Sequence, residues 1–225
     1  MDYELRDGLS FCQVDGHPVF LDIRNDRYFM LPTSLERVFS TYASGITTDV
    51  GTLAPLIARE LLVTARPHPA RPPPAMNSPV RSVLEQQATA RRASVHDYLE
   101  ALAAVVGIRF LLMMKPLDSV LRDVCVRRDA RVPSACASQA AATTEDTVTA
   151  THCFLQARKW IPVARMCLLD SLALVTYLTN RGLAANIVFG VSLSPFSAHC
   201  WVQSRDIVLN ETVTGAISHT RILTC

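Results

Sequence analysis

Cys167 and His199 are the two residues of this chain whose types and settings could do chemistry together. Cys167 opens an apolar helix-like run, and His199 follows later on a strand-like run. A helix N-terminus stabilises a thiolate, because its unpaired backbone N–H groups and the helix dipole favour negative charge. A thiolate beside a histidine can attack a carbonyl carbon, and the histidine can then protonate the leaving amine. The pair predicts a cysteine enzyme, although on spacing alone a core thiol and a sheet histidine fit the same pattern.

The strand that carries His199 should place its side chains on alternating faces. From Ala198 onward, His199, Trp201 and Gln203 share one face and Cys200 lies on the other. Cys200 is therefore predicted to point away from His199 and to be structural.

A third polar group should fix the tautomer of His199, and the next strand is expected from Ile207 to Glu211. If the chain reverses through the three residues 204–206, His199 lies directly opposite Glu211. A two-residue turn would instead set Glu211 opposite Cys200, because a one-residue slip inverts every side chain. We therefore predict a three-residue turn, with Glu211 as the acceptor and Asn210 as the alternative.

The elements that position this pair can be read from their boundaries. Pro162 allows a helix to begin before Cys167, and Gly182 supplies the left-handed residue that ends it. The following run, Ala185 to Val191, is continuously apolar, which is typical of a strand covered on both faces.

Upstream of the site the pattern is mostly helical. One or two helices are predicted within Ser82 to Met114, with a break near Gly107 or before Pro116, and another helix over Glu145 to Trp160. Between them, the charged cluster Arg127 to Arg131 is predicted to be a solvated loop.

The N-terminal third predicts strands followed by helices. An Asp-Gly turn separates the first two of three strand-like runs, which cover Leu9 to Val14, Val19 to Ile23 and Tyr28 to Leu31. Thr33 or Ser34 should cap a first helix, and a second is expected over Val50 to Leu62 with Pro55 in its first turn. Together with the later elements, these predict an α+β fold.

Five prolines between Ala65 and Pro74 mark the clearest domain boundary. We expect an N-terminal domain over residues 1–65, a proline-rich linker over 66–80 and a second domain over 81–225.

Composition excludes several classes of function. The chain has 225 residues, 49% of them hydrophobic, with 22 basic and 20 acidic residues, so nucleic acid is not an expected partner. Its seven cysteines form no C-x-x-C pair, which argues against both a zinc site and a compact disulfide framework and favours reduced thiols in a cytoplasm. No metal site is predicted. The acidic N-terminus is unlike a secretory signal, and the apolar run 101–114 is shorter than the ~20 residues that membrane insertion requires.

At the catalytic pair the sequence resembles the B proteins of lasso peptide biosynthesis, which are leader peptidases with a transglutaminase-like, papain-like cysteine protease fold. The matching motifs, in order, are Cys167-Leu168, Ser171-Leu172-Ala173-Leu174, Asn180-Arg181-Gly182, Val188-Phe189-Gly190-Val191 and Pro195-Phe196-Ser197-Ala198-His199-Cys200-Trp201-Val202. The resemblance implies a Cys-His-Asp triad whose aspartate ends a Leu-Asn-Asp phrase. Leu209-Asn210-Glu211 occupies that place here, so the third member is longer by one methylene.

The resemblance also covers the N-terminal third, which is similar to the PqqD-like, winged-helix domain that recognises leader peptides. It implies that a leader adds as a strand beside residues 28–31, with side chains entering a groove next to the second helix. The implied leader-binding residues are Tyr28, Phe29, Met30, Leu53 and Ile57.

The activity implied is removal of the leader from a lasso peptide precursor, which leaves the core peptide for macrolactam closure. The implied partners are that precursor and an asparagine-synthetase-like cyclase, and thiol chemistry requires no cofactor. Two alternatives remain at this point: acyl transfer to an amine in place of water, and a leader-binding adaptor whose second domain is inactive.

Overall fold

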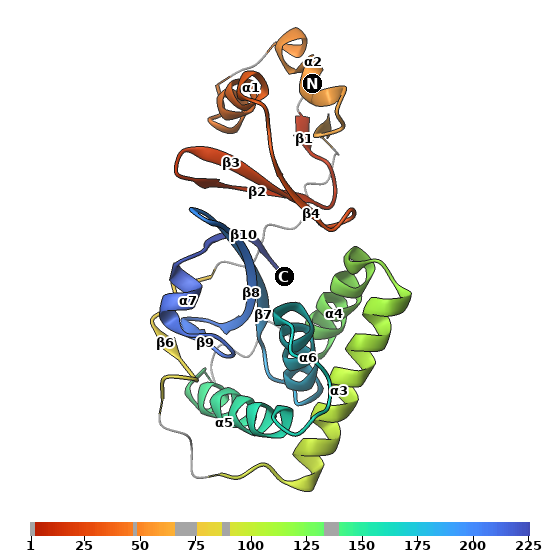
Figure 1. The fold of residues 1–225 in the computed structure, drawn as a ribbon, viewed down its shortest axis with the longest axis vertical. Helices are drawn as coiled ribbons and strands as arrows, with labels where there is room; N and C mark the ends of the chain where they lie inside the picture. Colours follow the sequence, from red (N-terminus) through yellow and green to blue (C-terminus); the bar gives the residue numbers. More distant parts are fainter. Residues whose placement is uncertain (1–2, 47–48, 66–75, 87–90, 133–139) are drawn as a thin grey trace.

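The computed structural model describes residues 3–46, 49–65, 76–86, 91–132 and 140–225, and the side chains of 140–143 are excluded from it. Within these ranges the protein is an α+β structure in which a three-stranded sheet near the N-terminus lies against a larger α+β unit built around a five-stranded sheet (Figure 1).

The N-terminal part begins as predicted, with three antiparallel strands in the order β2-β3-β4. Asp15 and Gly16, with φ of 51° and 84°, form the tight turn between the first two. The elements are β1 (Tyr3–Leu5), β2 (Leu9–Val14), β3 (His17–Asp22), β4 (Arg27–Met30), α1 (Thr33–Ala43), α2 (Val50–Ile57) and β5 (Leu62–Thr64). Among the residues that the structure describes, β4 pairs only with β3, so it is an edge strand of this sheet.

Both N-terminal helices differ from their predictions at one end. Pro32 occupies the N-cap of α1, and neither Thr33 nor Ser34 caps it through a side chain. The second helix ends at Ile57, and Pro55 lies in its interior and not in its first turn. Residues 62–64 instead form β5, which pairs with β1. Glu60 adopts a left-handed φ of 55° just before this change of direction.

The C-terminal part surrounds the helix that begins at Cys167. Its elements are β6 (Arg81–Ser82), α3 (Val95–Met114), α4 (Leu117–Arg131), α5 (Ala140–Arg158), α6 (Cys167–Asn180), β7 (Asn186–Leu193), β8 (Phe196–Ser204), β9 (Ile207–Val208), α7 (Val213–Ile217) and β10 (Thr220–Thr224). The strand order is β10-β7-β8-β9-β6. Helix α6 contacts α3, α4 and α5 as well as β7 and β8, so it lies in the centre of the core (Figure 1).

Helix α3 continues through Gly107 and ends before Pro116, the second of the two positions predicted for a break. One prediction for the preceding helices needs correction. The cluster Arg127 to Arg131 is not a loop, because it forms the last turns of α4, whose buried face consists of Val120, Leu121 and Val124. The other face of α4 is densely charged, so the composition of the segment indicates a solvated loop although a narrow apolar stripe is present.

The N-terminal sheet has two buried faces. One face packs under α1 and α2 through residues such as Phe20 and Phe39. The opposite face contributes Val14, Leu21 and Ile23 to the main core, which it shares with Ile222 of β10. Strands β2 and β3 accordingly contact β10 (Figure 1). The two parts are thus joined by packing, and the predicted proline-rich segment falls largely on residues 66–75, outside the described ranges.

Cys125 of α4 and Cys225 at the end of β10 form a disulfide. This finding corrects the expectation that all seven thiols are reduced. The two cysteines are 100 residues apart, so no local spacing pattern could have indicated their proximity. Among the described residues, none of the helices is long and apolar enough to cross a membrane.

Candidate active site

Cys167 is the first residue of α6, where Met166 serves as an extended N-cap. Its thiol is exposed. As the first helical residue, Cys167 has a backbone N–H without an acceptor inside the helix, so the thiol lies in the field of the helix N-terminus. The predicted start of a helix at Cys167 is therefore confirmed.

The loop before Cys167 is anchored by Arg158. This guanidinium is only 2% exposed and donates to three backbone carbonyls, those of Ile161, Val163 and Ala164. It also forms an ion pair with Asp170, one turn into α6, with Nε to Oδ1 at 2.7 Å. One buried cation thus connects α5, the loop and the first turn of the helix that carries the nucleophile.

His199 lies on β8, directly opposite Gly190 of β7. Its Nε2 is 2.7 Å from Oε2 of Glu211. With Nε2 donating to the carboxylate, Nδ1 is the nitrogen left to face the sulfur of Cys167, with which the ring interacts. The structure therefore brings together Cys167, His199 and Glu211.

The turn that leads to Glu211 is not the one predicted. Gln203 pairs with Val208 and Ser204 with Ile207, so the reversal uses the two residues Arg205 and Asp206. Arg205 adopts a left-handed φ of 56° in that turn. This register would leave Glu211 facing the wrong side of an ideal ladder. The pairing ends at Val208, however, and the irregular chain beyond it lets the carboxylate turn toward His199.

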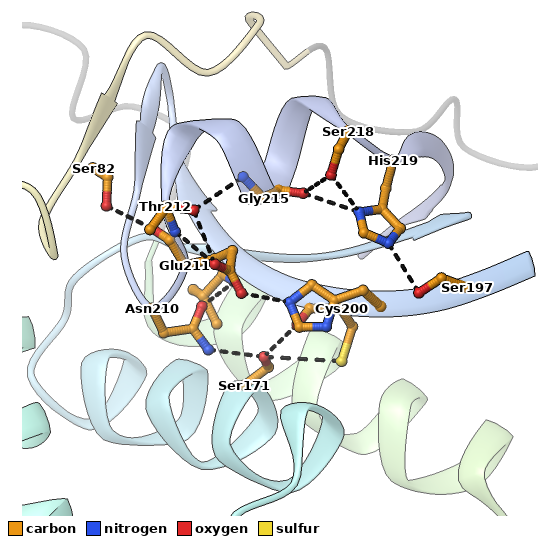
Figure 2. A network of polar contacts seen from close by, with 12 residues as sticks. Ser82, Ser171, Ser197, Cys200, Asn210, Glu211, Thr212, Gly215, Ser218 and His219 are labelled. Atoms are coloured by element: carbon orange, nitrogen blue, oxygen red, sulfur yellow. Dashed lines mark hydrogen bonds and ion pairs between the residues drawn. The ribbon is translucent and has the colours of Figure 1, made fainter. Parts of the chain in front are cut away.

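Glu211 is held from several directions (Figure 2). Its Oε1 accepts hydrogen bonds from the backbone N–H and the hydroxyl of Thr212, at 2.8 and 3.2 Å. Its backbone carbonyl accepts from the hydroxyl of Ser82. Gly215 packs so closely that an added Cβ would lie 2.6 Å from Oε1. The carboxylate that receives His199 is therefore fixed before any substrate arrives.

Asn210, the alternative third residue, makes different contacts. Its Oδ1 accepts from the backbone N–H of Val202 at 2.7 Å, and its Nδ2 donates to the hydroxyl of Ser171 at 3.0 Å. That hydroxyl donates in turn to the carbonyl of Cys200 (Figure 2). Both ends of the Asn210 amide are thus used to tie α6 to β8, and the structure places Glu211 on the imidazole.

Cys200 corrects the sequence interpretation in another way. It does lie on the opposite strand face from His199, but α6 packs against that face, so its thiol meets Cys167. Cys200 is buried, and together with Cys167 it lines a cavity. The residues around this cavity are Phe154, Leu155, Arg158, Arg165, Cys167, Asp170, His199, Cys200 and Asn210.

The site stabilises an ion pair between thiolate and imidazolium. Hydrogen bonds from the Cys200 thiol and from His199 lower the pKa of Cys167 to about 4, although burial opposes the shift. The hydrogen bond with Cys167 raises the pKa of His199, against burial and with help from Glu211. Burial alone would raise the pKa of Glu211, but hydrogen bonds from Thr212 and His199 outweigh it and lower that pKa. The charged forms of all three groups are therefore favoured together.

Two aromatic rings flank His199. Trp201 stacks at 6.3 Å between centroids and His219 lies at 5.6 Å. His219 is held by the carbonyl of Gly215 and the hydroxyl of Ser197, at 2.9 and 3.3 Å (Figure 2). Gly190 makes room, because a Cβ there would lie 2.8 Å from both His219 and Trp201. Sequence reasoning identified Trp201 but missed His219, because β10, which follows it, was not predicted.

The five predicted leader-binding residues have different environments. Leu53 is 2% exposed in the N-terminal core, and Phe29 stacks on Phe20 with centroids 5.2 Å apart. Ile57 is partly buried in the same cluster. Met30 is 45% exposed on the edge strand. Tyr28 packs toward the C-terminal part instead. Among these side chains, Met30 is exposed, Tyr28, Phe29 and Ile57 are partly buried and Leu53 is buried, so a role for the first four in binding a leader stays a prediction.

The described residues contain no group of three or more His, Cys, Asp or Glu side chains that could hold a metal ion. The chemistry that the observed arrangement can perform is nucleophilic attack by a thiolate, with proton transfer through His199.

The chain was compared with known protein families, curated proteins and solved structures. No curated protein and no solved structure matches the chain. The family model described as "Transglutaminase-like superfamily" matches residues 111–224, which span α6, β7 and β8 with Cys167, His199 and Glu211. Because this match covers half of the sequence, the chain belongs to the transglutaminase-like superfamily.

Proposed function

We propose that this protein is a cysteine endopeptidase that cleaves the leader from a lasso peptide precursor. The observation that carries the proposal is the exposed Cys167 thiol, with its lowered pKa, beside a His199 that is held by Glu211. The same arrangement on a transglutaminase-like domain is what the sequence resemblance to lasso B proteins implies.

The reaction follows from the positions of the groups. The thiolate of Cys167 attacks the carbonyl carbon of the scissile peptide bond, and the free N–H groups at the start of α6 stabilise the developing oxyanion. His199, already protonated in the ion pair, gives its Nδ1 proton to the leaving amine. It then takes a proton from water, which attacks the thioester and releases the acid product. Glu211 keeps Nε2 protonated and the ring oriented throughout.

The N-terminal part offers a place for the leader. One edge of strand β4 pairs with no other strand in the described part of the chain, and an extended peptide can add there as a further strand, with Met30 exposed beside it. Because β2 and β3 pack on β10, a leader bound at that edge would be held near the catalytic unit. Such tethering raises the effective concentration of the scissile bond at Cys167.

The proposed partners are the precursor peptide and an asparagine-synthetase-like cyclase that would use the free amine of the core peptide. The proteolytic step itself needs no cofactor, because the thiolate, the acid and the carboxylate are all supplied by the chain. Any requirement for ATP would belong to the cyclase step.

The experiment combines purified protein with a precursor and identifies products by mass spectrometry. The proposal expects two fragments that add up to the precursor plus one water, and no cleavage by the Cys167→Ala variant. Absence of cleavage by the purified wild type would support the adaptor alternative, in which catalysis belongs to another protein, and continued cleavage by Cys167→Ala would contradict the role of Cys167 as the nucleophile.

Acyl transfer is the second candidate, because Cys167 is exposed and the superfamily match does not separate hydrolysis from aminolysis. Adding a primary amine such as glycine ethyl ester distinguishes them. A transferase would convert most of the released acyl fragment into the amide, whereas a peptidase would give mainly the free carboxylate.

A further inference from the structure

Tyr28 lies on the opposite face of β4 from its neighbour Phe29. In the register with β3, Phe29 is opposite Phe20 and Tyr28 is opposite Leu21. Phe20 belongs to the core beneath α1 and Phe29 packs against that core, whereas Leu21 belongs to the main core and Tyr28, partly buried, packs against it. Tyr28 is therefore the β4 aromatic residue that the N-terminal sheet presents to the catalytic unit.

Its nearest aromatic partner is on the strand of the catalytic histidine. The rings of Tyr28 and Phe196 meet edge to face, at 6.0 Å between centroids and 65° between planes. Phe196 is the first residue of β8, three residues before His199, and is itself largely exposed. The phenol thus lies at the exposed end of β8 and not in a closed core.

The Tyr28 hydroxyl is available to donate a hydrogen bond to a substrate. It makes no hydrogen bond within the part of the chain that the structure describes, and it is not among the buried polar atoms that lack a partner. Burial raises the pKa of Tyr28, and the charge of the Cys167 thiolate adds to that effect. The phenol stays protonated, and is a hydrogen-bond donor at neutral pH.

We infer that Tyr28 is a substrate-contacting residue that the N-terminal part supplies to the active site, where its ring supports the peptide segment at Cys167 and its hydroxyl donates to a backbone carbonyl of that segment. Tyr28 does not line the cavity beside Cys167, so this contact adds to those made there. The inference rests on the proposed thiol chemistry at Cys167, but not on the identity of the peptide.

This role would join recognition to catalysis through one short strand. A peptide added at the free edge of β4 would pass Met30 and Tyr28 in succession, because both belong to that strand. The N-terminal part would then complete the active site as well as bind the leader. The main-core contacts of Leu21, which is opposite Tyr28, would keep the phenol in place.

The test compares two reagents that alkylate Cys167 in the full-length protein. Iodoacetamide is too small to lie along β4, whereas N-acetyl-trialanine chloromethyl ketone presents a peptide backbone. For each reagent, the rate of modification at Cys167 is measured by peptide-resolved mass spectrometry in wild type, Tyr28→Phe and Tyr28→Ala. Tyr42→Phe is the matched control, because its hydroxyl donates to the Tyr3 carbonyl within the N-terminal part, at 2.8 Å.

Tyr28→Phe should slow the peptidyl reagent about fivefold, the effect expected for one hydrogen bond, and leave the iodoacetamide rate within about twofold. Tyr28→Ala should slow the peptidyl reagent further, and Tyr42→Phe should change neither rate. An unchanged ratio of the two rates in Tyr28→Phe overturns the inference, whether neither rate falls or both fall together. If wild type fails to cleave the precursor, the proposed function fails while this ratio can still be measured.

Discussion

Glu211 receives the Nε2 hydrogen of His199 over 2.7 Å although the two residues do not face each other across the β8–β9 ladder. The contact forms because β9 ends at Val208 and the three following residues leave the strand geometry. A carboxylate placed beyond the end of a strand is not constrained by register, so glutamate can serve here despite its extra methylene.

The first prediction concerns the third member of the site. Glu211→Ala should lower kcat/KM by on the order of a hundredfold, because His199 loses the group that sets its tautomer and supports its charge. Glu211→Gln should retain orientation but lose the charge, and fall between wild type and Glu211→Ala. Steady-state cleavage of the precursor measures all three.

Asn210→Ala is the matched control for that series. It removes hydrogen bonds to Val202 and Ser171 and none to His199, so the expected loss is about 1–2 kcal/mol of unfolding free energy with a much smaller fall in kcat/KM. A larger catalytic defect in Asn210→Ala than in Glu211→Ala would transfer the orienting role to Asn210.

The second prediction is a pH profile. The thiolate of Cys167 exists above a pKa of about 4, and His199 stays protonated up to a pKa raised above its usual 6.5. The rate kcat/KM should therefore rise through about pH 4, stay high across the acidic to neutral range, and fall only when His199 deprotonates.

The third prediction tests the contribution of Cys200 to that profile. Cys200→Ala removes the thiol that donates to Cys167, so the pKa of Cys167 should rise and the acid limb of its alkylation by iodoacetamide should move to higher pH. Cys153→Ala, a change at another buried thiol, is the control and should leave the limb in place. Superimposable profiles for Cys200→Ala and wild type would show that the Cys200 thiol does not contribute to the acidity of Cys167.

The fourth prediction concerns the space around His199. Gly190→Ala should destabilise the fold by roughly 1–3 kcal/mol and lower activity, because the added Cβ meets His219 and Trp201 at 2.8 Å. Gly107→Ala is the control. No heavy atom lies within 4 Å of a Cβ there, and the position is inside α3, so a gain of about 0.5–1 kcal/mol is expected. Urea unfolding measures both changes.

The fifth prediction addresses the loop before the nucleophile. Arg158→Lys keeps the charge but cannot reproduce the bonds to three carbonyls and Asp170. Losing hydrogen bonds to these carbonyls should cost about 1–3 kcal/mol of unfolding free energy, although the lysine can keep a charge beside Asp170. Arg81→Lys, at an exposed ion pair with Asp206, serves as a control and should have little effect in the same denaturation experiment.

Local sequence signals were sufficient for the elements that carry the catalytic pair. The helix beginning at Cys167, its end at Gly182 and the buried strand after it all follow from residue types within a few positions, and the structure confirms them. The helical end of α4 was missed because its charged residues conceal a narrow buried face.

Contacts between distant segments could not be predicted in this way. The meeting of Cys200 with Cys167 depends on which face of β8 receives α6, and the position of His219 depends on β10 pairing with β7. Glu211 was assigned through a three-residue turn, whereas the observed turn has two residues. Its contact with His199 forms because the chain leaves the strand geometry after Val208, and counting residues along a strand cannot predict such a change.

The central claim is that Cys167 forms an acyl-enzyme with the leader part of a precursor. Rapid acid quenching followed by peptide-resolved mass spectrometry tests it directly. We expect the leader fragment to be attached as a thioester to Cys167, at a level that rises with precursor concentration, and no adduct or cleavage in Cys167→Ala. An adduct on a different residue, or undiminished cleavage by Cys167→Ala, would contradict it.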